Sequence, residues 1–87
     1  MAGIRVTVIG KDGCHLCDEA TEVITGVIQD FANVELEHRN LAEDPSWQRD
    51  YADKIPVVLV DGEEHCYWRV RPERLRESLA HAGAISR

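Results

Sequence analysis

Apolar residues along this chain fall into short strand-like runs and longer stretches with helical spacing. Residues 4–9 form a short, β-branched, mostly apolar run, which predicts a buried strand. Apolar residues then recur at spacings of three and four from Leu16 onward, and this period predicts an amphipathic helix ending near Asn33. Residues 34–38 alternate between apolar and polar types, as a half-buried edge strand does.

The middle of the chain predicts a short helix followed by a strand. Asp44 before Pro45 matches a helix cap with proline at the first helical position, which predicts a helix over residues 45–53. This helix carries two aromatic residues four positions apart, a spacing that predicts one packed aromatic face: Trp47 and Tyr51. Residues 55–60 are almost uniformly apolar, which indicates a strand covered on both faces.

A hairpin and a final helix complete the pattern. Asp61-Gly62 predicts a tight turn into a strand over residues 63–69. Pro72 predicts the start of a last helix, which ends near Gly83 and has one apolar face: Leu75, Leu79 and Ala82. The order β-α-β-α-β-β-α predicts an α/β fold with one four-stranded mixed sheet, and residues 1–87 are expected to form a single domain.

Composition and charge limit the classes of partner that we expect for this chain. The 87 residues are 44% hydrophobic, enough for one core, and 10 Lys and Arg against 16 Asp and Glu give a net charge of −6. An acidic surface repels phosphate backbones, so we expect no nucleic-acid partner. The N-terminal run is too short and too charged for a signal peptide or a membrane span. We therefore expect a cytoplasmic monomer that does not bind membranes.

Two of the three cysteines lie close together where the first strand meets the first helix. The segment Cys14-His15-Leu16-Cys17 puts a thiol at a helix N-terminus, where unpaired N–H groups and the helix dipole lower the pKa of a cysteine from about 8.5 to about 3.5–7.5. Cys14 is therefore the expected nucleophile. Cys17 lies one helical turn further on, which suits a resolving thiol that attacks a mixed disulfide formed at Cys14.

Two neighbouring residues bear on this pair. Lys11, just upstream, is placed to help hold a thiolate at Cys14. His15 titrates near pH 6.5, and it either stabilises the thiolate or only faces solvent. Cys66 lies within a strand, where a cysteine commonly behaves as a small buried hydrophobe.

A C-x-x-C pair is also found as half of a metal site, so other interpretations stay open. One is a metal or iron-sulfur binding module that uses four side chains: Cys14, Cys17, His65 and Cys66. Another is a non-catalytic adaptor that binds a partner beside Pro56. The strand before the pair, the helix after it and the apolar Ile-Pro strand downstream favour redox chemistry.

Three segments, in order along the chain, resemble the glutaredoxin-like branch of the thioredoxin superfamily. They are Cys14-His15-Leu16-Cys17-Asp18-Glu19-Ala20, Glu43-Asp44-Pro45, and Ile55-Pro56-Val57-Val58-Leu59-Val60-Asp61-Gly62. The resemblance implies a thioredoxin-like fold with Pro56 in cis beside the cysteine pair, where it shapes the groove for a peptide or glutathione.

The same resemblance implies a function. It implies a thiol-disulfide oxidoreductase that cycles Cys14 and Cys17 between dithiol and disulfide without a metal or organic cofactor. The expected substrates are disulfide-containing proteins or small disulfides, and the expected electron donor is an external thiol or a reductase.

The sequence departs from well-studied glutaredoxins in two places. His15-Leu16 replaces Pro-Tyr, and Tyr67-Trp68-Arg69-Val70-Arg71 replaces a Gly-Gly segment and the Asp that grips the amino group of glutathione. Pairing counted back from the hairpin turn places Cys66 opposite Val57 and Tyr67 opposite Pro56. Bulky aromatic residues near the groove argue against tight glutathione binding. The predicted groove comprises Lys11, His15, Ile55, Pro56 and Tyr67.

The remaining polar residues carry weaker signals. The three histidines at positions 38, 65 and 81 show no paired helical spacing, so surface roles are expected. Four arginines form a local basic cluster that either meets an anionic substrate tail or is solvated: Arg69, Arg71, Arg74 and Arg76.

Overall fold

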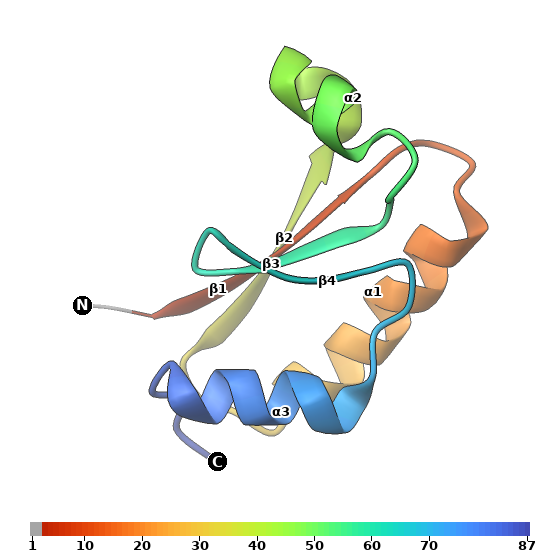
Figure 1. The fold of residues 1–87 in the computed structure, drawn as a ribbon. Coiled ribbons are helices and arrows are strands. Elements are labelled where there is room, and N and C mark those ends of the chain that lie inside the picture. The colour runs from red at the N-terminus through yellow and green to blue at the C-terminus, as the bar shows by residue number, and fades with distance from the viewer. Residues whose placement is uncertain (1–2) are drawn as a thin grey trace.

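The computed structural model describes residues 3–87 as one mixed sheet with helices packed against it (Figure 1). The strands are β1 (Ile4–Gly10), β2 (Val34–Asn40), β3 (Val57–Val60) and β4 (Glu63–Tyr67), in the spatial order β2-β1-β3-β4. Strand β1 runs parallel to β2 and antiparallel to β3, and β3 runs antiparallel to β4. The predicted α/β class and four-stranded mixed sheet are therefore confirmed.

The helices occupy the predicted segments with shorter ends. They are α1 (His15–Ile28), the 3-10 turn η1 (Leu41–Glu43), α2 (Pro45–Tyr51) and α3 (Pro72–His81). Helix α1 ends before the predicted Asn33 because the chain turns at Gln29 and Phe31 instead pairs with Ser86 in an isolated β-bridge. The Asp44 cap is confirmed, since its carboxylate accepts a hydrogen bond from the Ser46 N–H at 2.8 Å.

Both faces of the sheet are covered, by different helices. Helices α1 and α3 pack on one face, in a core that includes Val6, Val8, Ile24, Leu75 and Leu79. The other face buries Ile9, Leu41 and Val57 beneath the half-buried aromatic residues of α2, Trp47 and Tyr51. Figure 1 shows α1 and α3 together beneath the sheet and α2 apart from them. Within residues 3–87, no helix combines the length and the apolar character needed to cross a membrane.

The hairpin between β3 and β4 has the predicted turn but not the predicted register. Asp61 and Gly62 have φ values of 51° and 86°, the positive values that a tight primed turn requires. A β-bulge then inserts one extra residue, His65, so Cys66 lies opposite Val58 and Tyr67 opposite Val57.

The predicted pairs of Cys66 with Val57 and of Tyr67 with Pro56 are therefore wrong by one position. Strand β4 also ends at Tyr67 and not at Arg69, because the next residue, Trp68, turns the chain with a φ of 63°.

Candidate active site at the start of helix α1

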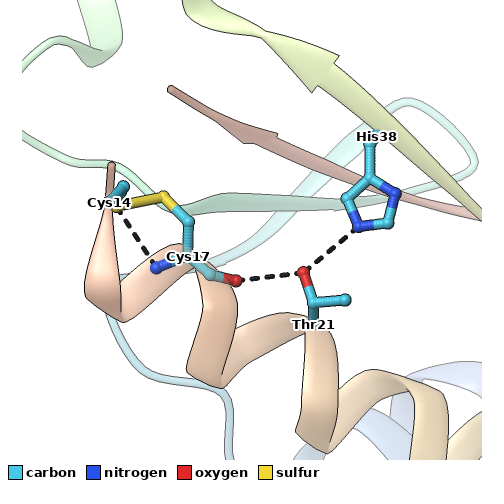
Figure 2. The surroundings of a disulfide bond; sticks show 4 residues. All are labelled: Cys14, Cys17, Thr21 and His38. Atoms are coloured by element: carbon cyan, nitrogen blue, oxygen red, sulfur yellow. Dashed lines mark hydrogen bonds between the residues drawn. A yellow bond between two sulfur atoms is a disulfide. The ribbon is translucent and has the colours of Figure 1, made fainter. Parts of the chain in front are cut away.

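The cysteine pair lies where β1 delivers the chain to α1. Cys14 is the N-cap of α1 and has extended backbone, and its Sγ accepts a hydrogen bond from the Cys17 N–H at 3.2 Å. The two residues are joined by a disulfide, with their Cα atoms 5.2 Å apart (Figure 2). In the reduced protein the same N–H group is placed to donate to a thiolate at Cys14.

The two cysteines differ in accessibility. Cys14 is half-buried at the helix start, whereas only 7% of the surface of Cys17 is exposed. A disulfide substrate can therefore approach Cys14 more readily than Cys17. This asymmetry fits a nucleophile at Cys14 and a resolving thiol at Cys17.

Gly10, the last residue of β1, packs directly against the inner cysteine. A Cβ atom at Gly10 would lie 2.6 Å from Cys17 Sγ and 3.1 Å from Cys17 Cβ. Because real Cβ contacts are essentially never shorter than 3.0 Å, only glycine leaves room for Cys17 here. This contact was not predicted, although a glycine that closes a buried strand just before C-x-x-C is a usable signal.

A hydrogen-bonded chain behind Cys17 ties α1 to the edge strand β2. Thr21 Oγ1 donates to the Cys17 carbonyl oxygen at 3.0 Å and lies 3.2 Å from His38 Nε2 (Figure 2). The hydroxyl donates its one proton to the carbonyl oxygen, so it accepts from His38 Nε2 in the tautomer that carries a proton on that nitrogen. His38 is exposed, as predicted, but its contact with Thr21 of α1 was not predicted.

The peptide bond between Ile55 and Pro56 is cis, as the family resemblance implies. Pro56 is fully buried, and its carbonyl oxygen accepts a hydrogen bond from the Trp68 N–H at 2.8 Å. The Trp68 indole is 53% exposed and donates from Nε1 to the Asp53 carbonyl oxygen at 3.1 Å. With Leu16 of α1, Trp68 lines a cavity of about 270 Å³. This cavity beside the first turn of α1 is the candidate substrate groove. The predicted groove residues Ile55 and Pro56 do not line it, because Pro56 is buried and Ile55 packs against the cluster around Val57.

Lys11 and His15 lie near the pair but do not meet in one site. Lys11 is exposed and lines a cavity of about 520 Å³ on the Cys17 and His38 side of the pair. The side chain of His15 is 89% exposed, and its Nε2 lies 3.2 Å from a Glu19 carboxylate oxygen. Of the two interpretations of His15, the geometry favours the one in which it faces solvent.

Tyr67 belongs to the opposite, α2-covered face of the sheet and packs against the cluster around Val57. Its hydroxyl donates to the carboxylate of Glu64, which also accepts from the Tyr51 hydroxyl at 2.7 Å. These bonds lower the pKa of Glu64, and the bond from Tyr51 raises the pKa of that phenol to about 12. Tyr67 was predicted to line the groove, but the bulge shifts it by one position along the partner strand. The aromatic residue that lines the groove with Leu16 is therefore Trp68.

The four residues of the alternative metal site are not brought together. Cys14 and Cys17 lie at the start of α1, whereas His65 and Cys66 line a cavity between β4 and α3. In the described part of the chain, residues 3–87, no three His, Cys, Asp or Glu side chains converge in an arrangement suited to a metal ion.

Comparison with known proteins gives both a family and a fold. A family model described as Glutaredoxin-like domain (DUF836) matches residues 5–80. The chain is 28% identical over 86 residues to an uncharacterized protein of Mycobacterium tuberculosis, Rv0508, and the match covers 94% of this chain and 89% of that protein.

Two solved structures extend the comparison. Protein Ne2328 from Nitrosomonas europaea superposes with a TM-score of 0.77 at 24% identity, over 90% of this chain and 93% of that chain. A mutant thioredoxin from Halobacterium salinarum superposes with a TM-score of 0.62 at 13% identity, over 90% of this chain and 73% of that chain. These superpositions show that the fold is thioredoxin-like.

Proposed function

The chain belongs to the glutaredoxin-like domain family, and we propose that it is a thiol-disulfide oxidoreductase working through Cys14 and Cys17. The observation that carries the proposal is the placement of Cys14 as the N-cap of α1, where its Sγ accepts the Cys17 N–H at 3.2 Å. A fixed hydrogen-bond donor aimed at the sulfur stabilises the thiolate, which is the nucleophile in disulfide exchange.

The reaction proceeds in two exchanges. The Cys14 thiolate attacks one sulfur of the substrate disulfide, forming a mixed disulfide and releasing one substrate thiolate. Cys17, deprotonated, then attacks Cys14 Sγ, which releases the second substrate thiolate and leaves the Cys14–Cys17 disulfide. The substrate gains two electrons. An external thiol or a reductase supplies two electrons to restore the dithiol.

We infer that the substrate is a disulfide-containing protein or a small disulfide that binds in the groove lined by Leu16 and Trp68, beside the first turn of α1. Glutathione is expected to bind weakly, because Tyr67-Trp68-Arg69-Val70-Arg71 stand in place of the Gly-Gly segment and the Asp that grips its amino group. A dithiol that must be reduced again after each cycle suits a reducing compartment, so we propose that the protein is cytoplasmic. We also propose that it is a monomer. Its net charge of −6 argues against a nucleic-acid partner.

Reduction of a neutral model disulfide, hydroxyethyl disulfide, tests the function. Wild-type protein with dithiothreitol as electron donor should accelerate the reduction above the rate of dithiothreitol alone. Cys14→Ser should remove the acceleration, and the matched control Cys66→Ser should retain it, because Cys66 lies in a different cavity from the α1 pair. Loss of activity in Cys66→Ser with retention in Cys14→Ser would overturn the assignment.

A further inference from the structure

A third cavity, of about 500 Å³, lies between the edge strand β4 and helix α3. We call it the arginine cavity after the cations that line it together with a histidine, a free thiol and one carboxylate: His65, Cys66, Arg69, Arg71, Arg74 and Glu77. The proposed thiol exchange uses none of these side chains, although Arg69 and Arg71 also line the candidate groove beside Leu16.

The β-bulge and the period of α3 build this cavity. In a regular strand His65 and Cys66 would point to opposite faces, but the extra residue in β4 allows both to line the same cavity beside α3. His65 Nδ1 lies 3.0 Å from the Ser78 hydroxyl, which ties the bulge to the helix. Arg71 and Arg74, three positions apart at the start of α3, line the wall opposite.

The charge of the cavity is opposite to that of the whole chain. Three arginines face one carboxylate, Glu77, in a protein whose net charge is −6. Arg69 approaches Glu19 only to 3.9 Å, and Arg71 and Arg74 form no ion pair within residues 3–87. Elsewhere three arginines have a carboxylate oxygen within 3.2 Å: Arg5, Arg39 and Arg76.

The positive field reaches the floor of the cavity. Burial and then the charge of Arg74 lower the pKa of His65. Arg71 and Arg74 are exposed and have no carboxylate partner within residues 3–87, and the cavity that they line is partly buried on the side of His65. Charged hydrogen bonds are stronger on that side than in open water.

We propose that the arginine cavity binds the acid groups of a small anionic molecule, carboxylate or phosphate, through Arg71 and Arg74. The planar guanidinium fork matches both kinds of oxyanion, and a volume of about 500 Å³ suits a small ligand. Because Arg71 also lines the candidate substrate groove, the proposal is tested on the oxidised protein without turnover, where thiol exchange does not contribute.

The first experiment measures the field at Cys66. In the oxidised protein, Cys14 and Cys17 are joined, and Cys66 is the free thiol. We compare the rates at which Cys66 is alkylated by anionic iodoacetate and by neutral iodoacetamide. Exposure and thiolate fraction affect both rates equally and cancel in their ratio, so the ratio reports the local charge. Arg71→Gln and Arg74→Gln should each lower this ratio about threefold, the order expected for one unit charge several Å away in wet surroundings.

A matched control lies on the same helix. Arg76 is paired with Asp30 at 2.7 Å and does not line the cavity, so Arg76→Gln should change the ratio little. Equal changes in all three variants, or no change in Arg71→Gln and Arg74→Gln, would overturn the proposal.

The second experiment measures binding with defined anions, citrate and pyrophosphate. Either anion should slow Cys66 alkylation by iodoacetamide in a saturable way and raise the pKa of His65 followed by NMR. If only citrate protects Cys66, the site binds carboxylates, and if only pyrophosphate protects it, the site binds phosphates. Protection by both anions identifies a general oxyanion site. Arg74→Lys should keep the alkylation ratio, because lysine keeps the positive charge. It should weaken binding of the anion, because lysine lacks the planar guanidinium group that holds two oxygens at once. Absence of saturable protection by both anions would contradict the proposal.

Discussion

Replacing Gly10 with alanine probes the packing that holds Cys17 in place. The added Cβ would lie 2.6 Å from Cys17 Sγ and 3.1 Å from Cys17 Cβ. The backbone of Gly10 lies outside the left-handed region, so the cost of Gly10→Ala comes from the contact and not from backbone strain. Overpacking a buried site by one methyl group costs about 1–3 kcal/mol.

The expected size follows from the length of the domain. For 60–100 residues, 1 kcal/mol corresponds to about 4–8 °C in Tm, so a cost of about 1–3 kcal/mol should lower the Tm of Gly10→Ala by about 4–24 °C. The matched control is Gly26→Ala, on the exposed surface of α1, where a Cβ meets nothing within 4 Å. That substitution should raise stability by about 0.5–1 kcal/mol, because alanine is the better helix former.

A double-mutant cycle in the reduced protein locates the cost. In a Cys17→Ala background, Gly10→Ala should destabilise the protein less than in wild type, because the sulfur it would meet is gone. Urea denaturation followed by circular dichroism gives the four free energies of unfolding. An unchanged Tm in Gly10→Ala, or a cost that does not depend on the residue at position 17, would refute the account of this contact.

Three further predictions follow from the site. Cys14 in the reduced protein should be alkylated by iodoacetamide faster than Cys17 at neutral pH, because it is more exposed and opens the helix; mass spectrometry of digests would show the reverse order if the roles were exchanged. Glutathione should bind weakly, so NMR titration should show no saturable shifts in the micromolar range near Trp68. The pKa of Glu64 is lowered in the folded protein, so its stabilisation is complete above its ordinary value of 4.5 and is lost as the pH falls through the folded value. The difference in urea midpoint between wild type and Glu64→Gln should therefore shrink from pH 7 to pH 3, and a constant difference would contradict it.

The sequence predicted the position of the cysteine pair well because local rules determine it. A strand that ends at a turn and a helix that begins after Cys14 place its thiol at the N-cap without long-range information. The position of the hairpin turn was also predictable from local sequence, since Asp61 and Gly62 tolerate positive φ.

Features that depend on pairing between distant segments were missed. The bulge at His65 has no local marker, and it moved Cys66 and Tyr67 by one position relative to the partner strand. The contact of Gly10 with Cys17 and the bond between Thr21 and His38 join segments whose distance is fixed only when α1 packs on the sheet. The cavity beside the arginines likewise forms only when β4 meets α3.

The central claim is that Cys14 attacks the substrate and Cys17 resolves the intermediate. The most direct measurement is intact-mass and peptide mass spectrometry of reduced Cys17→Ser after incubation with hydroxyethyl disulfide. We predict one mixed disulfide per chain, located on Cys14, which accumulates because no resolving thiol remains. An adduct located on Cys66, or failure of any adduct to accumulate while Cys17→Ser still turns over at the wild-type rate, would contradict the mechanism.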